Sequence, residues 1–211
     1  MSAHPFSSEI TPETYVSELD FNTAIGLNAK DAYAYYGRGK TNFKRGLQED
    51  AIADFTKAIK YNPKKAKYWF FRGKAKMRLA AFTEAITDFD KAIQLDDQYI
   101  EIYIERAHAK SKNKQVTAAL ADIKAALKIQ PKYPYAFYSK GLIYYRAGRF
   151  SEAIAAFNAC IELFEDYAYA YYYRAESYHA LGKKRYACSD WEASYSYGVD
   201  DAVPSINKYC R

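Results

Sequence analysis

The chain is poor in the residues that interrupt regular structure. Its 211 residues include only 9 glycines and 6 prolines, which disfavours a turn-rich β-sandwich and excludes a collagen-like or linker-dominated chain. Half of the residues are hydrophobic, which is enough for a sizeable core and excludes wholesale disorder. We therefore expect a globular protein with one domain of ordinary size or two small ones.

Cysteines, export signals and membrane-spanning segments are also scarce. The three cysteines, Cys160, Cys188 and Cys210, are too few for a disulfide framework and their number is odd, so we expect a reducing compartment. The N-terminus has no basic segment followed by an apolar one, and no apolar run approaches the roughly 18 residues of a membrane helix. These absences predict a cytoplasmic protein that does not contact a membrane.

Charge and tyrosine are unevenly distributed. The net charge is +6, but residues 1–31 carry −4 and residues 32–65 carry +5. This balance falls short of a polybasic chain that binds nucleic acid through charge alone. Tyrosine is the unusual component, at 23 residues, and suggests many half-buried positions or a binding surface.

The central feature is an internal repeat with a period of 34 residues. The segment near residue 53, ADFTKAIKYNP, aligns with TDFDKAIQLDD near residue 87, and the same spacing continues along the chain. Five units follow one another without insertion or deletion: 32–65, 66–99, 100–133, 134–167 and 168–201. Residues 1–31 are left as an N-terminal segment with a capping helix, and residues 202–211 as a short C-terminal capping helix.

Five columns of the repeat alternate between large and small residues. Position 4 is always aromatic and position 24 is large, whereas positions 8, 20 and 27 are small. The large residues at positions 4 and 24 are Tyr35, Trp69, Tyr103, Phe137 and Tyr171, and Phe55, Phe89, Ile123, Phe157 and Trp191. Small residues let helices approach and large ones fill the space between them. The apolar spacing is helical, and a break near position 15 separates two helices in each unit.

This pattern resembles the tetratricopeptide repeat, and the resemblance covers residues 32–201. It implies an all-α fold: a right-handed solenoid of antiparallel helix pairs in which each first helix lines a concave groove. It also implies a non-enzymatic protein-interaction scaffold without cofactor or metal. We find no convincing catalytic, nucleotide or metal motif: Gly39-Lys40-Thr41 lies inside an expected helix, and the three histidines are far apart.

The resemblance also assigns residues to the groove. Aromatic anchors surrounded by cations suit an extended peptide with acidic and apolar side chains. The expected partner-binding residues are Tyr36, Lys40, Lys44, Phe70, Phe71, Lys74, Arg78, His108, Tyr138, Tyr145, Tyr169, Tyr172 and Tyr173. Some of these tyrosines could instead only fill space between neighbouring first helices.

Repeat positions 7 and 23 predict a ladder of ion pairs. The basic residues Arg38, Arg72, Arg106 and Arg174 would pair with Asp54, Asp88, Asp122 and Asp190, whereas the fourth unit has Lys140 and Ala156 instead. We interpret the loss of the acid as the reason that the planar, bidentate arginine is not needed there. An anion-binding basic stripe is the alternative.

The groove positions also bear on other kinds of partner. The clamp that related repeats use for the C-terminal tail of chaperones needs Lys at position 5 and Asn at position 9, but Tyr36 and Lys40, or Phe70 and Lys74, occupy these positions. The chaperone tail is therefore not the expected partner. The alternatives are an RNA-binding helical repeat, disfavoured by the 34-residue period and the modest charge, and a regulatory subunit of an enzyme complex. The sequence leaves self-association through the caps or the convex face open.

Overall fold

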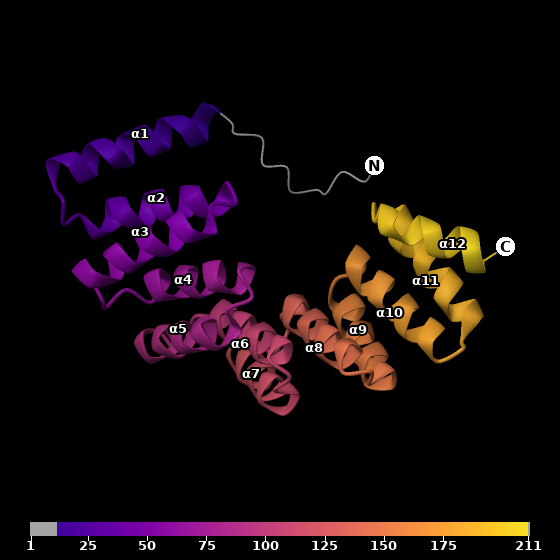
Figure 1. Ribbon diagram of the computed structural model, residues 1–211. Helices are drawn as coiled ribbons and strands as arrows, with labels where there is room; N and C mark the ends of the chain where they lie inside the picture. The colour runs from indigo at the N-terminus through magenta and orange to yellow at the C-terminus, as the bar shows by residue number, and fades with distance from the viewer. Residues whose placement is uncertain (1–11, 211) are drawn as a thin grey trace. The chain divides into compact units, whose positions relative to one another are not determined.

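The predicted all-α fold class is confirmed. The computed structural model describes the backbone of residues 12–210 and the side chains of residues 19–210, and every regular element in this part of the chain is helical. Figure 1 shows successive helices joined by short connections. The α-helices are α1 (Pro12–Leu27), α2 (Ala32–Lys44), α3 (Gln48–Tyr61), α4 (Ala66–Arg78), α5 (Phe82–Leu95), α6 (Ile100–Lys112), α7 (Val116–Ile129), α8 (Pro134–Arg146), α9 (Phe150–Leu163), α10 (Ala168–Ala180), α11 (Lys184–Ser196) and α12 (Val203–Tyr209).

The first helices of the pairs begin at residues 32, 66, 100, 134 and 168, which are 34 residues apart. Each pair turns at repeat position 15, where the backbone adopts a positive φ. Gly46, Gly148 and Gly182 take this conformation at φ values of 81°, 71° and 71°, and Ala80 and Lys114 take it at 58° and 62°. Glycine adopts it without a steric penalty, so the two non-glycine turns carry a small local strain.

Large and small residues pack as their columns suggest. A Cβ atom added at Gly73 would lie 2.7 Å from the Phe89 ring, and one at Gly39 would lie 2.8 Å from the Phe55 ring. Gly141 has the same relation to Phe157. All three phenylalanine side chains are fully buried. The small residue at position 8 is therefore required because the ring at position 24 occupies the space of its side chain.

The chain divides into two compact units, and the division falls within α6 between Ala109 and Lys110. The first unit contains the pairs α2–α3 and α4–α5, with α1 packed on α2. The second unit contains α7 and the pairs α8–α9 and α10–α11. Within the described residues, no helix combines the length and the apolar character needed to cross a membrane.

Each end of the described chain carries a cap. At the start, the Phe21 ring of α1 lies over Gly37 of α2, while residues 1–11 of the predicted N-terminal segment lie outside the described residues. At the end, a 3₁₀ turn at Asp200–Ala202 leads into α12. Tyr209 of α12 covers the fully buried Trp191, with ring centroids 5.9 Å apart, so this short helix closes the apolar end of the second unit.

Candidate functional site

The arginines at repeat position 7 make bidentate ion pairs inside the stack. Arg38 donates from Nε and Nη2 to the two carboxylate oxygens of Asp54, at 2.9 and 2.6 Å. Arg72 binds Asp88 in the same way at 2.9 and 2.7 Å, and Arg174 binds Asp190 at 2.7 Å through both nitrogens. The aspartates are almost fully buried. This geometry favours a structural role over an anion-binding stripe, because the guanidinium groups already have their anions.

These three arginines and Arg106 share a further contact that the sequence analysis missed. Each extends Nη1 back to repeat position 25 of the preceding second helix, 16 residues earlier. The acceptors are Asn22 for Arg38, Thr56 for Arg72, Asp90 for Arg106 and Asn158 for Arg174. Each arginine therefore ties its own helix pair to the one before it. The polar residues recurring at position 25 were the available signal.

Two parts of the expected ladder differ from the three regular pairs. Arg106 donates to Asp90 at 2.6 Å and Lys110 contacts Asp122 at 2.8 Å, but the pair of Arg106 and Asp122 would span the two units and stays a prediction. Lys140 has no carboxylate partner among the described residues of the second unit, as expected from Ala156.

The pKa of Arg174 reflects its pair with Asp190. Burial lowers this pKa, but the hydrogen bonds and charge of Asp190 outweigh burial and raise it.

In the first unit, aromatic rings and cations share the surface formed by α2 and α4. The Phe71 ring contacts Tyr36 at 5.6 Å and Phe43 at 6.4 Å between centroids. Lys40 places its ammonium 5.6 Å from the rings of both Tyr36 and Phe71. We define the basic groove face by the six residues of this surface: Tyr36, Lys40, Phe43, Phe71, Lys74 and Arg78.

The far end of the basic groove face surrounds a hollow of about 330 Å³. The guanidinium of Arg78 lies 4.9 Å from the Phe43 ring, and the ammonium of Lys74 lies 3.5 Å from the carboxylate of Glu105. Glu105 thus offsets one of the charges at this end. Lys44 is exposed at the end of α2, and His108 is half-buried on α6.

Phe70, which we expected to contact a partner in the groove, is instead buried. Its side chain is only 3% exposed and lies in the core with Phe89 and Tyr99, at ring distances of 6.0 and 5.1 Å. This expectation needs correction: the helix turns Phe70 toward the second helix of its own pair, so almost none of its surface remains for a ligand.

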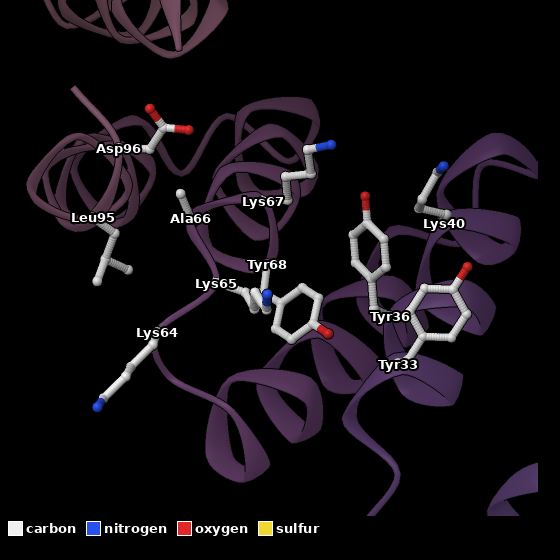
Figure 2. Close-up of a pocket in the computed structure, with 10 residues that line it drawn as sticks. All are labelled: Tyr33, Tyr36, Lys40, Lys64, Lys65, Ala66, Lys67, Tyr68, Leu95 and Asp96. Carbon is white, nitrogen blue, oxygen red and sulfur yellow. The ribbon is translucent and has the colours of Figure 1, made fainter. Parts of the chain in front are cut away.

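The near end of the same surface opens into a pocket of about 600 Å³ (Figure 2). We call it the lysine pocket, and it lies between the N-terminal ends of α2 and α4. Its lining residues are Tyr33, Tyr36, Lys40, Lys64, Lys65, Ala66, Lys67, Tyr68, Leu95 and Asp96. In Figure 2, Lys40 and Lys67 extend on the side of the Tyr36 hydroxyl, whereas Leu95 and Asp96 lie across the pocket.

The tyrosines of the lysine pocket differ in exposure. Tyr33 is 69% exposed, whereas Tyr68 is buried against Tyr36 with ring centroids 4.9 Å apart. Burial raises the pKa of Tyr36 to about 12, and burial followed by the charge of Asp31 raises that of Tyr68. Both phenols are therefore protonated near neutral pH. The sequence analysis missed Lys64 and Lys65 because they lie in the connection before α4, outside the groove positions of the repeat.

In the second unit, the groove tyrosines pack mostly on each other. Tyr138 has Tyr167 at 4.9 Å, and Phe157 and Tyr173 at 6.1 and 6.2 Å. Burial raises its pKa well above the usual value. Tyr138 is half-buried, like Tyr36 in the first unit, so its expected role as a partner contact stays a prediction.

The remaining groove tyrosines of this unit surround the same cluster. Tyr173 contacts Tyr145 at 5.4 Å and Tyr172 at 5.2 Å, and all three are half-buried. Tyr169 is 44% exposed. Of the tyrosines expected in this half of the groove, Tyr169 alone is exposed among the described residues.

The cysteines correct another expectation. Cys188 of α11 and Cys210, directly after α12, form a disulfide with their Cα atoms 5.5 Å apart. The count of three cysteines suggested no disulfide, but folding of the C-terminal cap brings these two together. Cys160 is free and buried, and burial raises its thiol pKa to about 12, which makes it a poor nucleophile.

Comparison with known proteins agrees with this architecture. A tetratricopeptide repeat profile matches residues 49–100, 104–168 and 144–195, and a second profile of the same repeat matches residues 32–65. A search of curated protein sequences finds no match.

Several solved structures share the fold. MamA is 22% identical with a TM-score of 0.65, over 80% of this chain and 92% of that one. YrrB, described as a TPR protein with an unusual peptide-binding site, is 21% identical with a TM-score of 0.63, over 89% and 97%. A tetratricopeptide repeat protein from Parabacteroides merdae is 18% identical with a TM-score of 0.74, over 90% and 75%. Since the profiles cover well over half of the sequence, the chain belongs to the tetratricopeptide repeat family.

Proposed function

We propose that the first unit binds an extended, acidic and partly apolar segment of a partner protein on its basic groove face. The fold supports a protein–protein interaction scaffold in general, and the family is generally non-catalytic, so we propose no reaction. The structure of YrrB is described as having a peptide-binding site, and that description supports the same class of ligand here.

The observation that carries this proposal is the position of Lys40. Its ammonium lies 5.6 Å from two aromatic rings and has no carboxylate partner among the described residues. A partner carboxylate can therefore reach this charge without displacing an internal ion pair. The neighbouring rings of Tyr36, Phe43 and Phe71 offer apolar surface beside it, and cations near this surface would accelerate the approach of an acidic segment.

Selection from a random displayed peptide library tests this proposal. We expect enriched peptides to combine acidic residues with aromatic or branched apolar ones, and to bind more weakly as salt is added. Lys40→Glu should weaken their binding at least about tenfold because it reverses a charge next to the ligand. Lys57→Glu is the matched control, since Lys57 is exposed on α3 away from this surface.

Two results would contradict the proposal: a library that yields no enriched sequence, or peptides whose affinity changes equally in Lys40→Glu and Lys57→Glu. Single-stranded RNA is the alternative ligand that basic and aromatic surfaces can bind. Tighter binding of an oligouridylate than of every selected peptide, with the same dependence on Lys40, would favour it.

The disulfide between Cys188 and Cys210 bears on where the protein works. Disulfides persist in oxidising compartments and are rare in the cytosol. We therefore propose a non-reducing compartment in place of the cytoplasmic location expected from the sequence. Trapping free thiols with an alkylating reagent in the native cell, followed by mass spectrometry, should find Cys188 and Cys210 unmodified; alkylation of both would favour the cytoplasm.

A further inference from the structure

The lysine pocket carries four ammonium groups and one carboxylate. Lys40, Lys64, Lys65 and Lys67 have no carboxylate partner among the described residues. The single acidic lining residue, Asp96, accepts a hydrogen bond from the backbone of Gln98 at 3.2 Å. The pocket therefore has an excess of positive charge that the first unit does not neutralise.

The pocket also offers ring surface next to these charges. Tyr33 is 69% exposed although it belongs to a regular helix, and its ring centroid lies 6.5 Å from that of Tyr36. Asp31 fixes the start of this helix, because its side chain accepts hydrogen bonds from the backbone N–H groups of Tyr33 and Ala34 at 2.9 and 3.0 Å. A partner ring can stack on Tyr33 without any rearrangement of the backbone.

The size of the pocket suits a few side chains. Its volume of about 600 Å³ lies in the roughly 300–1,000 Å³ range of ligand sites. The protonated phenols of Tyr36 and Tyr68 add hydrogen-bond donors at its wall. We propose that this pocket anchors the acidic partner segment by receiving one aromatic side chain against Tyr33, with flanking carboxylates on Lys64, Lys65 and Lys67. This inference rests on the proposed function and deepens it.

Fluorescence anisotropy on the full chain tests the anchor. The probe is a labelled peptide of about ten residues in which glutamates flank two phenylalanines, with versions that replace Glu by Gln or Phe by Ala. The pocket variant is the triple substitution Lys64→Glu, Lys65→Glu and Lys67→Glu. The control variant is Lys57→Glu, Lys60→Glu and Lys91→Glu, which changes the charge equally at exposed positions of α3 and α5.

We expect the pocket variant to lose at least about tenfold more affinity than the control variant, because only its charges lie beside the ligand. Tyr33→Ala should weaken the phenylalanine peptide about threefold to tenfold and leave the alanine peptide unchanged. Circular dichroism of each variant shows that the helices are retained, since the substituted side chains are exposed.

Four results would overturn the anchor. Equal losses in the two triple variants would mean that only the overall charge matters. No binding of the probe by the unmodified chain would exclude this ligand chemistry, while the library selection still judges the proposed function. Tighter binding of an oligouridylate than of the peptide, lost in the pocket variant, would assign the pocket to nucleic acid. Lys40→Glu and Arg78→Glu could weaken binding of the peptide while the pocket variant binds it as tightly as its control. In that case the basic groove face binds the peptide and the lysine pocket does not.

Discussion

Repeat position 5 is occupied by Tyr36 in the first unit and by Tyr138 in the second. Tyr36 lines an open pocket beside four lysines, whereas Tyr138 is packed among Tyr167, Phe157 and Tyr173. The position along the helix is the same, but the neighbours contributed by the next pair differ. The same repeat position therefore lies beside lysines in one unit and among tyrosines in the other, although both rings are half-buried.

The ion-pair ladder shows the same contrast. The first unit has two bidentate pairs with buried aspartates, whereas the fourth repeat, in the second unit, has Lys140 opposite Ala156. The second unit keeps the bidentate pair of Arg174 and Asp190 in its fifth repeat, and adds a tyrosine cluster and a disulfide at its cap. Bidentate pairs therefore stabilise both stacks, but the second unit has one interruption in its ladder and a covalent link in addition.

The largest expected effect comes from breaking one regular pair. Arg72→Ala should cost about 3–5 kcal/mol of unfolding free energy, because it removes two hydrogen bonds of about 1.5–3 kcal/mol each from a buried carboxylate, which keeps only Lys76 at 2.7 Å as its charge partner. Lys140→Ala, at the same repeat position, should cost less than about 1 kcal/mol. Urea unfolding measures the cost, and hydrogen exchange should show the loss in α4 and α5. Equal costs would remove the distinction between the two units.

The disulfide should be the next largest contribution. The double variant Cys188→Ser and Cys210→Ser should lose about 3 kcal/mol, because the link closes a loop with a sequence separation of 22. Hydrogen exchange should rise in α12 and the C-terminal half of α11 while α2 and α4 keep their protection. A uniform rise along the chain would mean that the cap stabilises more than its own unit.

Alkaline pH should weaken the tyrosine cluster. Burial raises the pKa of Tyr138, so its phenol keeps in the folded state a proton that the unfolded chain releases above about pH 10. Its stabilising contribution is complete below that pH and is lost as the pH rises. The unfolding free energy of Tyr138→Phe, taken relative to that of the unmodified chain, should therefore be about 1 kcal/mol higher at about pH 11 than at about pH 8. Urea midpoints by circular dichroism measure this, with the unmodified chain as the reference at both pH values.

The smallest effect should come from restoring the missing pair. Ala156→Asp alone should destabilise the second unit, because it buries a carboxylate next to a lysine of unsuitable geometry. Adding Lys140→Arg should return the stability to within about 1 kcal/mol of the unmodified chain. A double variant no more stable than Ala156→Asp would show that the backbone of the fourth repeat no longer accommodates the pair.

The repeat made much of this architecture predictable. The glycine and phenylalanine columns placed Gly39 against Phe55 and Gly73 against Phe89, and the arginine column placed Arg38 beside Asp54. These contacts lie within one helix pair, where sequence spacing determines distance. Lys64 and Lys65 could not be predicted as pocket residues, because they leave the regular helix and meet the pocket only through the bend between two pairs.

The sequence by itself determined the helices, their turns and the packing within each pair, because helical hydrogen bonds and apolar periodicity are local. The tertiary structure decided which tyrosines keep an exposed ring, that Phe70 is buried and that Cys188 meets Cys210. Each of these depends on side chains from a neighbouring helix pair or the cap, and their approach is determined by how the helices stack rather than by any spacing in the chain.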